Sequence, residues 1–173
     1  MLESFENLKP IGDKGEQQAI DFIKKVLKQD ILSSNNNYKY DVLTTNNIKY
    51  EVKKDLKAQY TKNLFVEYGT GYDKNIKMTL PPINNIKASG ISNTESNYYI
   101  FVFDNIYNLD LVESFILIDT SKLKSFIKEN EPRSTTHRNN FYNTTSYGYL
   151  IPIEQIKSIS TNYIKYNEIY INV

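Results

Sequence analysis

The sequence contains no cysteine and only one histidine, His137, among its 173 residues. The absence of cysteine excludes disulfide scaffolds, thiol catalysis, iron–sulfur clusters and cysteine-ligated zinc. A single histidine excludes a histidine-rich metal site, and we do not expect His137 itself to act as a ligand or a base. Any metal ion is therefore expected to be held mainly by oxygen atoms, which favours magnesium, manganese or calcium.

Long apolar runs are also absent. No stretch has the length needed to cross a bilayer, and the first ten residues, MLESFENLKP, lack the apolar core of a signal peptide. We therefore expect an intracellular protein with no membrane association. With 40% hydrophobic and 24% charged residues, the chain is expected to form one domain over residues 1–173.

Neither sign of charge dominates, because 21 basic and 20 acidic residues leave a net charge of +1. No global basic field therefore indicates a nucleic-acid partner. Residues 38–90 carry nine lysines against five acids, a local excess of +4. Such a region is compatible with binding to a phosphate backbone, and equally with ordinary solvated lysines. The abundance of Asn, Ile, Tyr and Lys is typical of an AT-rich genome.

The spacing of apolar residues predicts a helix over residues 13–28. Its apolar stripe contains Ile20, Ile23 and Leu27, and Glu16 lies one turn before Ile20 on the same face. We therefore expect the Glu16 carboxylate to point toward the body of the domain. The alternative is that this acid only complements the dipole of the first helical turn.

Two alternating segments, 38–43 and 48–53, predict a β-hairpin around the turn sequence Thr-Thr-Asn-Asn. A three-residue loop puts both apolar sets on one face, and that register pairs Asp41 with Glu51. The Cβ atoms of such a pair are about 5 Å apart, and Lys53 lies on the same face. Because one lysine neutralises only one of two close carboxylates, a divalent cation is the simplest way to balance their charge.

The remaining pattern predicts an α/β fold, with a central mixed β-sheet flanked by helices. The segment 98–103 is expected to be a central strand buried on both faces. The core is expected at about 13–130, with 131–173 forming a polar loop and terminal strands. The other expected elements are strands at 64–68, 114–118 and 149–153, a helix at 121–129, a long irregular connection at 69–97, a polar segment at 131–147 and a hairpin at 163–173.

The motif formed by Asp41 and the triplet Glu51-Val52-Lys53 resembles the PD-(D/E)XK nuclease superfamily, which includes many restriction endonucleases and Holliday-junction resolvases. The matching text is YKYDVLTTNNIKYEVKKD, preceded by the helical segment GDKGEQQAIDFIKKVL. The resemblance implies a restriction endonuclease-like core and a metal-dependent phosphodiesterase site. One feature departs from the fullest pattern, since Tyr40 stands where a proline often precedes the first acid.

The same resemblance assigns roles to these residues. Asp41, Glu51 and the carbonyl of Val52 would ligate Mg²⁺, for which Mn²⁺ would substitute. Lys53 would orient the attacking water or stabilise developing charge, and as a base it would need a lowered pKa. Glu16 would hold a metal-bound water or help to bind a second metal. Outside the motif, Glu67 is a further candidate acid, with an ordinary charge at the rim as its alternative.

We expect a Mg²⁺-dependent DNA endonuclease, a homodimer that cleaves duplex or branched DNA in the cytoplasm of a bacterium, or of a host cell for a phage or virus. A structure-directed or junction-type enzyme is favoured, because the core uses most of the chain. The alternatives are a restriction-type, sequence-specific endonuclease and a catalytically inactive nucleic-acid-binding or assembly protein. The cations expected to meet DNA are Lys54, Lys57, Lys62, Lys87, Arg133 and Arg138.

Overall fold

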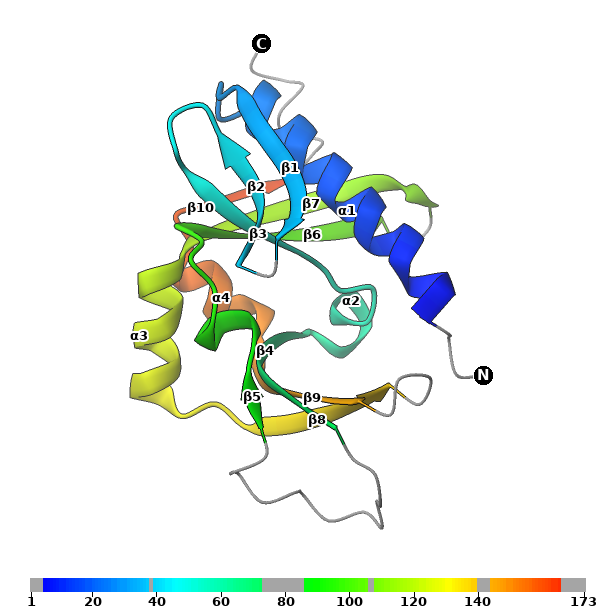
Figure 1. The fold of residues 1–173 in the computed structure, drawn as a ribbon, viewed down its shortest axis with the longest axis vertical. Helices are drawn as coiled ribbons and strands as arrows, with labels where there is room; N and C mark the ends of the chain where they lie inside the picture. Colours follow the sequence, from blue (N-terminus) through cyan, green and yellow to red (C-terminus); the bar gives the residue numbers. More distant parts are fainter. Residues whose placement is uncertain (1–4, 38, 73–85, 106–107, 140–143, 166–173) are drawn as a thin grey trace.

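The computed structural model describes residues 5–37, 39–72, 86–105, 108–139 and 144–165, which form two β-sheets and the helices around them (Figure 1). The elements are α1 (Phe5–Lys25), β1 (Ile31–Asn37), β2 (Tyr40–Thr44), β3 (Lys49–Lys54), α2 (Ala58–Thr61), β4 (Asn63–Tyr72), β5 (Lys87–Ala88), the 3₁₀ turn η2 (Gly90–Ser92), β6 (Tyr98–Asn105), β7 (Asn108–Asp119), α3 (Thr120–Asn130), β8 (Ser134–Asn139), β9 (Thr144–Pro152), α4 (Ile153–Ile159) and β10 (Asn162–Lys165).

The larger sheet has six strands in the order β1-β2-β3-β6-β7-β10. Its β3 and β6 run parallel, and its other neighbours run antiparallel, so the sheet is mixed. A second, antiparallel sheet has the order β5-β4-β9-β8. The predicted α/β class with a mixed sheet is thus confirmed, whereas the second sheet was not expected.

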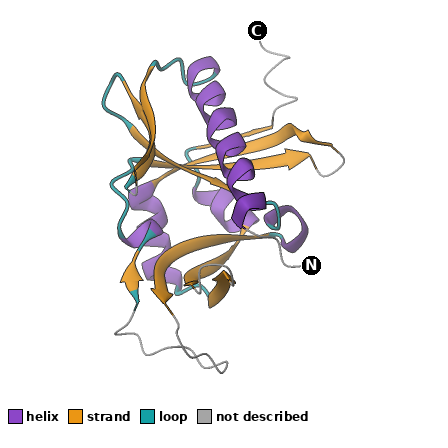
Figure 2. Ribbon diagram, turned by 45° about the vertical axis from the view of Figure 1, so that its right-hand side comes forward, coloured by secondary structure: helices purple, strands orange, loops and turns teal. Residues whose placement is uncertain are grey.

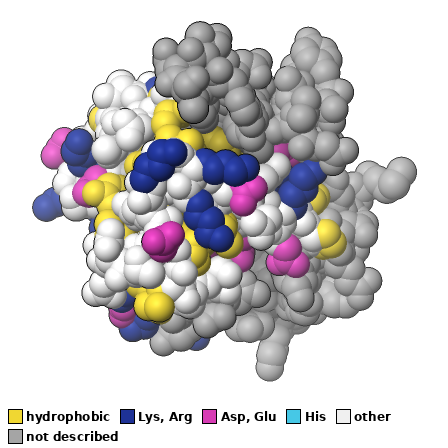
Figure 3. All heavy atoms as spheres, turned by 90° about the horizontal axis from the view of Figure 1, so that it is seen from above, with side chains coloured by type: hydrophobic (Ala, Val, Ile, Leu, Met, Phe, Trp, Pro, Cys, Tyr) yellow, Lys and Arg dark blue, Asp and Glu magenta, His cyan; other side chains and the backbone are white. Residues whose placement is uncertain are grey.

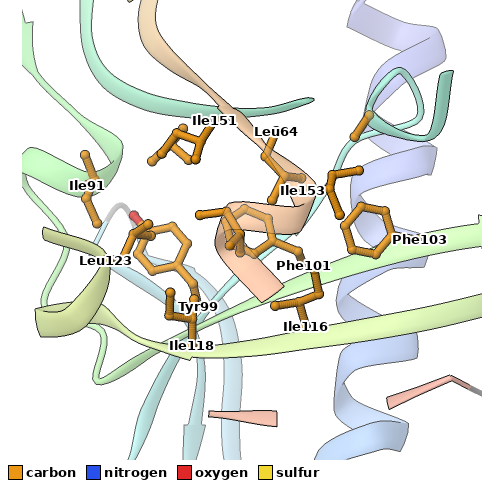
Figure 4. Packing of buried hydrophobic residues seen from close by; sticks show 13 residues of the cluster. Leu64, Ile91, Tyr99, Phe101, Phe103, Ile116, Ile118, Leu123, Ile151 and Ile153 are labelled. Carbon is orange, nitrogen blue, oxygen red and sulfur yellow. The ribbon is translucent and has the colours of Figure 1, made fainter. Parts of the chain in front are cut away.

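The larger sheet is covered on both faces (Figure 2). On one face α1 lies across the strands, and its Ile20 and Ile23 pack in a buried cluster with Ile100 of β6. On the other face, Phe101 of β6 packs in a cluster that also contains side chains of α3, α4 and the second sheet (Figure 4). The residues from Tyr99 to Phe103 are all at most 5% exposed, so the prediction of a central strand is confirmed.

The hairpin of β2 and β3 has the predicted register. Val42 pairs with Tyr50, and the Thr44 N–H donates to the Ile48 carbonyl at 3.0 Å. The three-residue loop ends at Asn47, whose φ of 61° is the left-handed conformation that asparagine tolerates. The observed ladder ends at the Val42–Tyr50 pair, one step before Asp41 and Glu51.

Helix α1 starts earlier than predicted, at Phe5, and ends at Lys25 rather than at residue 28. It passes very close to the end of β3 at Gly15, where an added Cβ would lie 2.8 Å from the Cβ of Lys54. Only glycine permits this approach without displacing the helix. The crossing places the next residue, Glu16, beside the hairpin.

The prediction of a polar loop at 131–147 is wrong, because this segment contains β8 and the start of β9. Strand β8 is the edge of the second sheet, and such a strand needs no alternating apolar residues. Sequence patterns also missed β1, β5, α2 and α4. Strand β10 pairs with β7, and residues 166–173, most of the expected terminal hairpin, lie outside the described part. None of the described helices is long and apolar enough to span a membrane.

Candidate functional site

Alternation along β3 separates an apolar face from a charged one. Tyr50 and Val52 are buried in the cluster beneath α1, so Glu51 and Lys53 point to the opposite face, toward the second sheet. The Lys53 Nζ lies 2.6 Å from Glu51 Oε1, and the side chains are 39% and 9% exposed, respectively. The buried carboxylate is therefore paired with an ammonium group that still reaches solvent.

Asp41 joins this pair through the backbone of the neighbouring strand. Its Oδ2 accepts a hydrogen bond from the Val52 N–H at 2.6 Å, at the point where β2 begins at Tyr40. The side chain of Asp41 thus occupies the position of a strand partner. Because the N–H and C=O of one strand residue point to the same side, the Val52 carbonyl is also directed toward the β2 side.

The surroundings of Asp41 disfavour the charged form of its carboxylate. Burial is the largest influence on its pKa, and the Glu51 carboxylate adds to it. Lys53 and the Val52 N–H act in the opposite direction, yet the pKa is raised to about 6. An additional positive charge at this place would lower that pKa, which is the electrostatic condition that favours cation binding.

Lys53 remains protonated at neutral pH. Burial alone would lower its pKa, but the carboxylates of Glu51 and Asp41 outweigh burial and raise the pKa to about 12. In this arrangement the side chain can supply positive charge and donate hydrogen bonds. It cannot accept a proton unless its surroundings change.

Glu16 of α1 belongs to the same electrostatic group. Burial raises its pKa, the negative charges of Asp41, Asp13 and Glu51 raise it further, and Lys53 lowers it. The carboxylate of Glu16 therefore faces the hairpin residues, as the apolar stripe of the helix predicted. The structure thus brings together all four side chains of the expected catalytic group: Glu16, Asp41, Glu51 and Lys53.

The segment before β6 packs against the hairpin beside Glu51. Thr94 Oγ1 lies 3.5 Å from Glu51 Oε2 and donates to the Lys39 carbonyl at 3.0 Å. The carboxylate of Glu95 pairs with the ammonium groups of Lys39 and Lys49, the latter at 3.0 Å. These contacts hold the segment against both strands, so one wall of the site comes from residues far away in sequence.

Glu67 of β4 lies at the outer side of the site. Its Oε1 accepts a hydrogen bond from Ser89 Oγ at 2.6 Å, and its charge contributes to the raised pKa of Lys53. The neighbouring Gly90 has a φ of 49°, and a Cβ there would lie 2.3 Å from the Glu67 carbonyl oxygen. A glycine is therefore required where this segment crosses β4.

The donors at the site suit a hard cation. Asp41 and Glu51 offer carboxylate oxygens, and the Val52 carbonyl is directed to the same side. Within the described ranges, no group of three or more His, Cys, Asp or Glu side chains could hold a metal ion. Mg²⁺ commonly binds through one or two carboxylates and keeps several waters, so a two-carboxylate site fits this ion.

Lys54 differs from its predicted role in DNA binding. Its Nζ donates to Asp104 Oδ1 at 2.8 Å and to Gln18 Oε1 at 2.7 Å. The side chains of Lys54 and Asp104 are each 2% exposed, so this ammonium cannot reach a phosphate. The reason is alternation, since an even-numbered residue of β3 faces α1.

The other expected DNA contacts are dispersed over the surface. Four of them are exposed: Lys57 and Lys62 flank α2, Lys87 lies in β5, and Arg133 precedes β8. Arg138 lies in β8 opposite Thr145, and its side chain is outside the described part. On the face shown in Figure 3, basic and acidic side chains alternate rather than forming a field of one sign. His137 is exposed in β8, away from the residues grouped above.

Tyr99 is a residue of the site that the sequence did not indicate. The parallel pairing of β3 with β6 places it directly beside Glu51. Its side chain is 1% exposed, and burial together with the charges of Glu51 and Asp41 raises the pKa of its hydroxyl. Sequence patterns predicted the strand but carried no signal for this long-range register.

Comparison with family models, with curated proteins and with solved structures finds no match to this chain.

Proposed function

We propose that this protein is a metal-dependent phosphodiesterase, an endonuclease that cleaves DNA at the site formed by Asp41, Glu51 and Lys53. The observation that carries the proposal is the pair of partly buried carboxylates beside one ammonium group, with Asp41 anchored to the Val52 N–H. A restriction endonuclease-like core is part of the proposal. The resemblance implies a central mixed sheet flanked by helices. The larger sheet has α1 on one face and α3 and α4 on the other, which supports this part of the proposal.

Different residues of the chain would have separate roles in hydrolysis. Asp41, Glu51 and the Val52 carbonyl would hold Mg²⁺, with Mn²⁺ as a substitute; when bound, the ion stabilises developing negative charge and lowers the pKa of a water molecule. The protonated Lys53 adds positive charge where a phosphoryl oxygen becomes more negative. Glu16, whose pKa is raised, would hold the attacking water and accept its proton.

The proposed partner is duplex or branched DNA, bound by a homodimer that sets two sites against opposing strands. The exposed Lys57, Lys62 and Lys87 would meet phosphates. Contacts of this kind position the duplex without reading its sequence. They support a structure-directed enzyme.

A restriction-type enzyme is a second candidate, and the second sheet favours it. A sequence-specific nuclease needs an element besides its core to read base edges. Strands β4, β5, β8 and β9 are such an addition, and Glu67 of β4 connects them to the site. Exposed polar side chains of β8, among them Thr136 and His137, are of the kind that form hydrogen bonds with bases.

Nicking of supercoiled plasmid with Mg²⁺ or Mn²⁺ tests the proposal. We expect cleavage by the wild type, loss of at least a hundredfold in rate for Asp41→Ala and Lys53→Ala, and wild-type cleavage by Lys124→Ala, an exposed lysine of α3. Cleavage that survives both site substitutions would refute the assignment.

Binding of linear, branched and single-stranded DNA without any cleavage would instead favour the inactive binding protein. Discrete fragments from linear DNA would identify the restriction-type enzyme, and preference for a branched substrate the structure-directed one.

A further inference from the structure

Tyr99 lies in β6 with its side chain next to that of Glu51. The two residues are partners in the parallel β3–β6 ladder, so their side chains stand side by side on the face toward the second sheet. The ring of Tyr99 belongs to the cluster around Leu123 and Phe101 (Figure 4). Because a tyrosine side chain is longer than a glutamate side chain, its hydroxyl extends past the neighbouring carboxylate.

The hydroxyl of Tyr99 has no hydrogen-bond partner within the part of the chain that the structure describes. Thr94 is its polar neighbour, but the two side chains do not meet the geometry of a hydrogen bond. Buried polar groups are nearly always hydrogen-bonded, and an exception opposes folding. A polar group that is retained at a cost to stability is typical of a functional site.

This hydroxyl is available as a hydrogen-bond donor. Burial is the main cause of its raised pKa, and the carboxylates of Glu51, Asp41 and Glu67 add to it. A tyrosine hydroxyl is protonated at neutral pH in any surroundings, so it has one proton to donate. Thr94, the polar neighbour of this hydroxyl, has its Oγ1 3.5 Å from Glu51 Oε2, so the hydroxyl lies close to that carboxylate.

We propose that the Tyr99 hydroxyl donates a hydrogen bond to a buried water molecule held beside Glu51, a water that would belong to the shell of the bound metal ion. Tyr99 is then a binding residue of the site, additional to the four charged residues of the motif and helix. The inference rests on the proposed function, because the metal ion of that function would hold the water molecule that accepts the hydrogen bond.

Tyr99→Phe removes only the hydroxyl, and Tyr50→Phe is its matched control. Tyr50 lies in the neighbouring strand on the opposite face, and its hydroxyl donates to Gln29 Oε1 at 2.9 Å. Without divalent ions we expect Tyr99→Phe to keep or raise the Tm, and Tyr50→Phe to lower it. In calorimetric titrations with Mn²⁺ alone, we expect an affinity about fivefold weaker for Tyr99→Phe, the effect of one hydrogen bond, and no change for Tyr50→Phe.

A weaker Mn²⁺ affinity without DNA assigns the accepting oxygen to water. Two results overturn the inference: a wild-type Mn²⁺ affinity in Tyr99→Phe, or a fall in its Tm that matches that of Tyr50→Phe. A wild-type protein that neither binds Mn²⁺ nor nicks DNA would reject the proposed function itself.

Discussion

At the scale of single residues, Asp41 combines burial with a second carboxylate, and its pKa rises from the ordinary 3.8 to about 6. Between these two values the folded protein binds a proton that the unfolded chain does not. Stability therefore falls as the pH rises through this window, and the charged form at neutral pH opposes folding. This is the reverse of the usual effect of an aspartate.

We expect Asp41→Asn to raise the free energy of unfolding at pH 7.5, without divalent ions, by about 1–3 kcal/mol. The asparagine oxygen can still accept the Val52 N–H, while the repulsion from Glu51 is removed. Urea denaturation measures the change. As a control, Asp119→Asn should not stabilise, because hydrogen bonds from Ser121 keep the pKa of Asp119 below its ordinary value. A less stable Asp41→Asn would show that its charge supports the fold.

The same carboxylate makes cation binding depend on pH. A divalent ion must displace the proton of Asp41, so its binding should weaken as the pH falls through about 6. We expect Mn²⁺ to raise the Tm clearly at about pH 8 and hardly at all at about pH 5, as measured by thermal melts with and without the ion. An equal increase at both pH values would place Mn²⁺ elsewhere on the protein.

At the scale of elements, the crossing of α1 over β3 determines where Glu16 lies. The helix approaches the strand at Gly15, and the buried Lys54 continues the contact to Gln18 of α1 and to Asp104 of β6. Both features involve Lys54, which directly follows Lys53 of the site in β3. Helix position and site geometry are therefore coupled.

Two glycines of α1 make a matched pair for testing this coupling. We expect Gly15→Ala to lower the free energy of unfolding by about 1–3 kcal/mol, because the new Cβ would meet Lys54 at 2.8 Å. We expect Gly12→Ala to raise it by about 0.5–1 kcal/mol, because apart from the adjoining helix backbone no described atom lies within 4 Å of the added Cβ, and alanine favours a helix. Urea denaturation compares the two. Equal effects of both substitutions would contradict the close approach.

At the scale of the whole molecule, the two hydrophobic clusters share β6 and β7. Ile100 and Phe115 belong to the cluster beneath α1, and Phe101 and Ile116 belong to the cluster on the opposite face. Neither cluster can lose these strands without exposing the other. The larger sheet therefore packs against α1 on one face and against α3, α4 and the second sheet on the other.

We expect a single unfolding transition, with coincident urea curves from far-ultraviolet circular dichroism and tyrosine fluorescence. Ile100→Ala and Ile116→Ala, one from each cluster, should each shift this one transition by about 2–5 kcal/mol. Both side chains are 0% exposed, which makes them a matched pair. A second transition that responds to only one of the two substitutions would separate the clusters.

The sequence by itself determined the features that depend on neighbouring residues. Alternation of apolar residues and the Asn-rich turn define the register of the hairpin, and with it the proximity of Asp41 to Glu51. A continuous apolar run defines β6, and helical spacing places Glu16 on the inner face of α1. Each of these patterns follows from burial of one side of a short segment, which local sequence reveals.

Only the tertiary structure decided which distant segments meet. The polar edge strand β8, the second sheet, the partner of Lys54 and the position of Tyr99 beside Glu51 all depend on pairings between residues far apart in the chain. Edge strands need little apolar alternation, and the register between β3 and β6 is set by how the whole sheet is covered. For this physical reason the charged group of the site was predictable from the sequence, whereas its walls and the uncharged donor beside it were not.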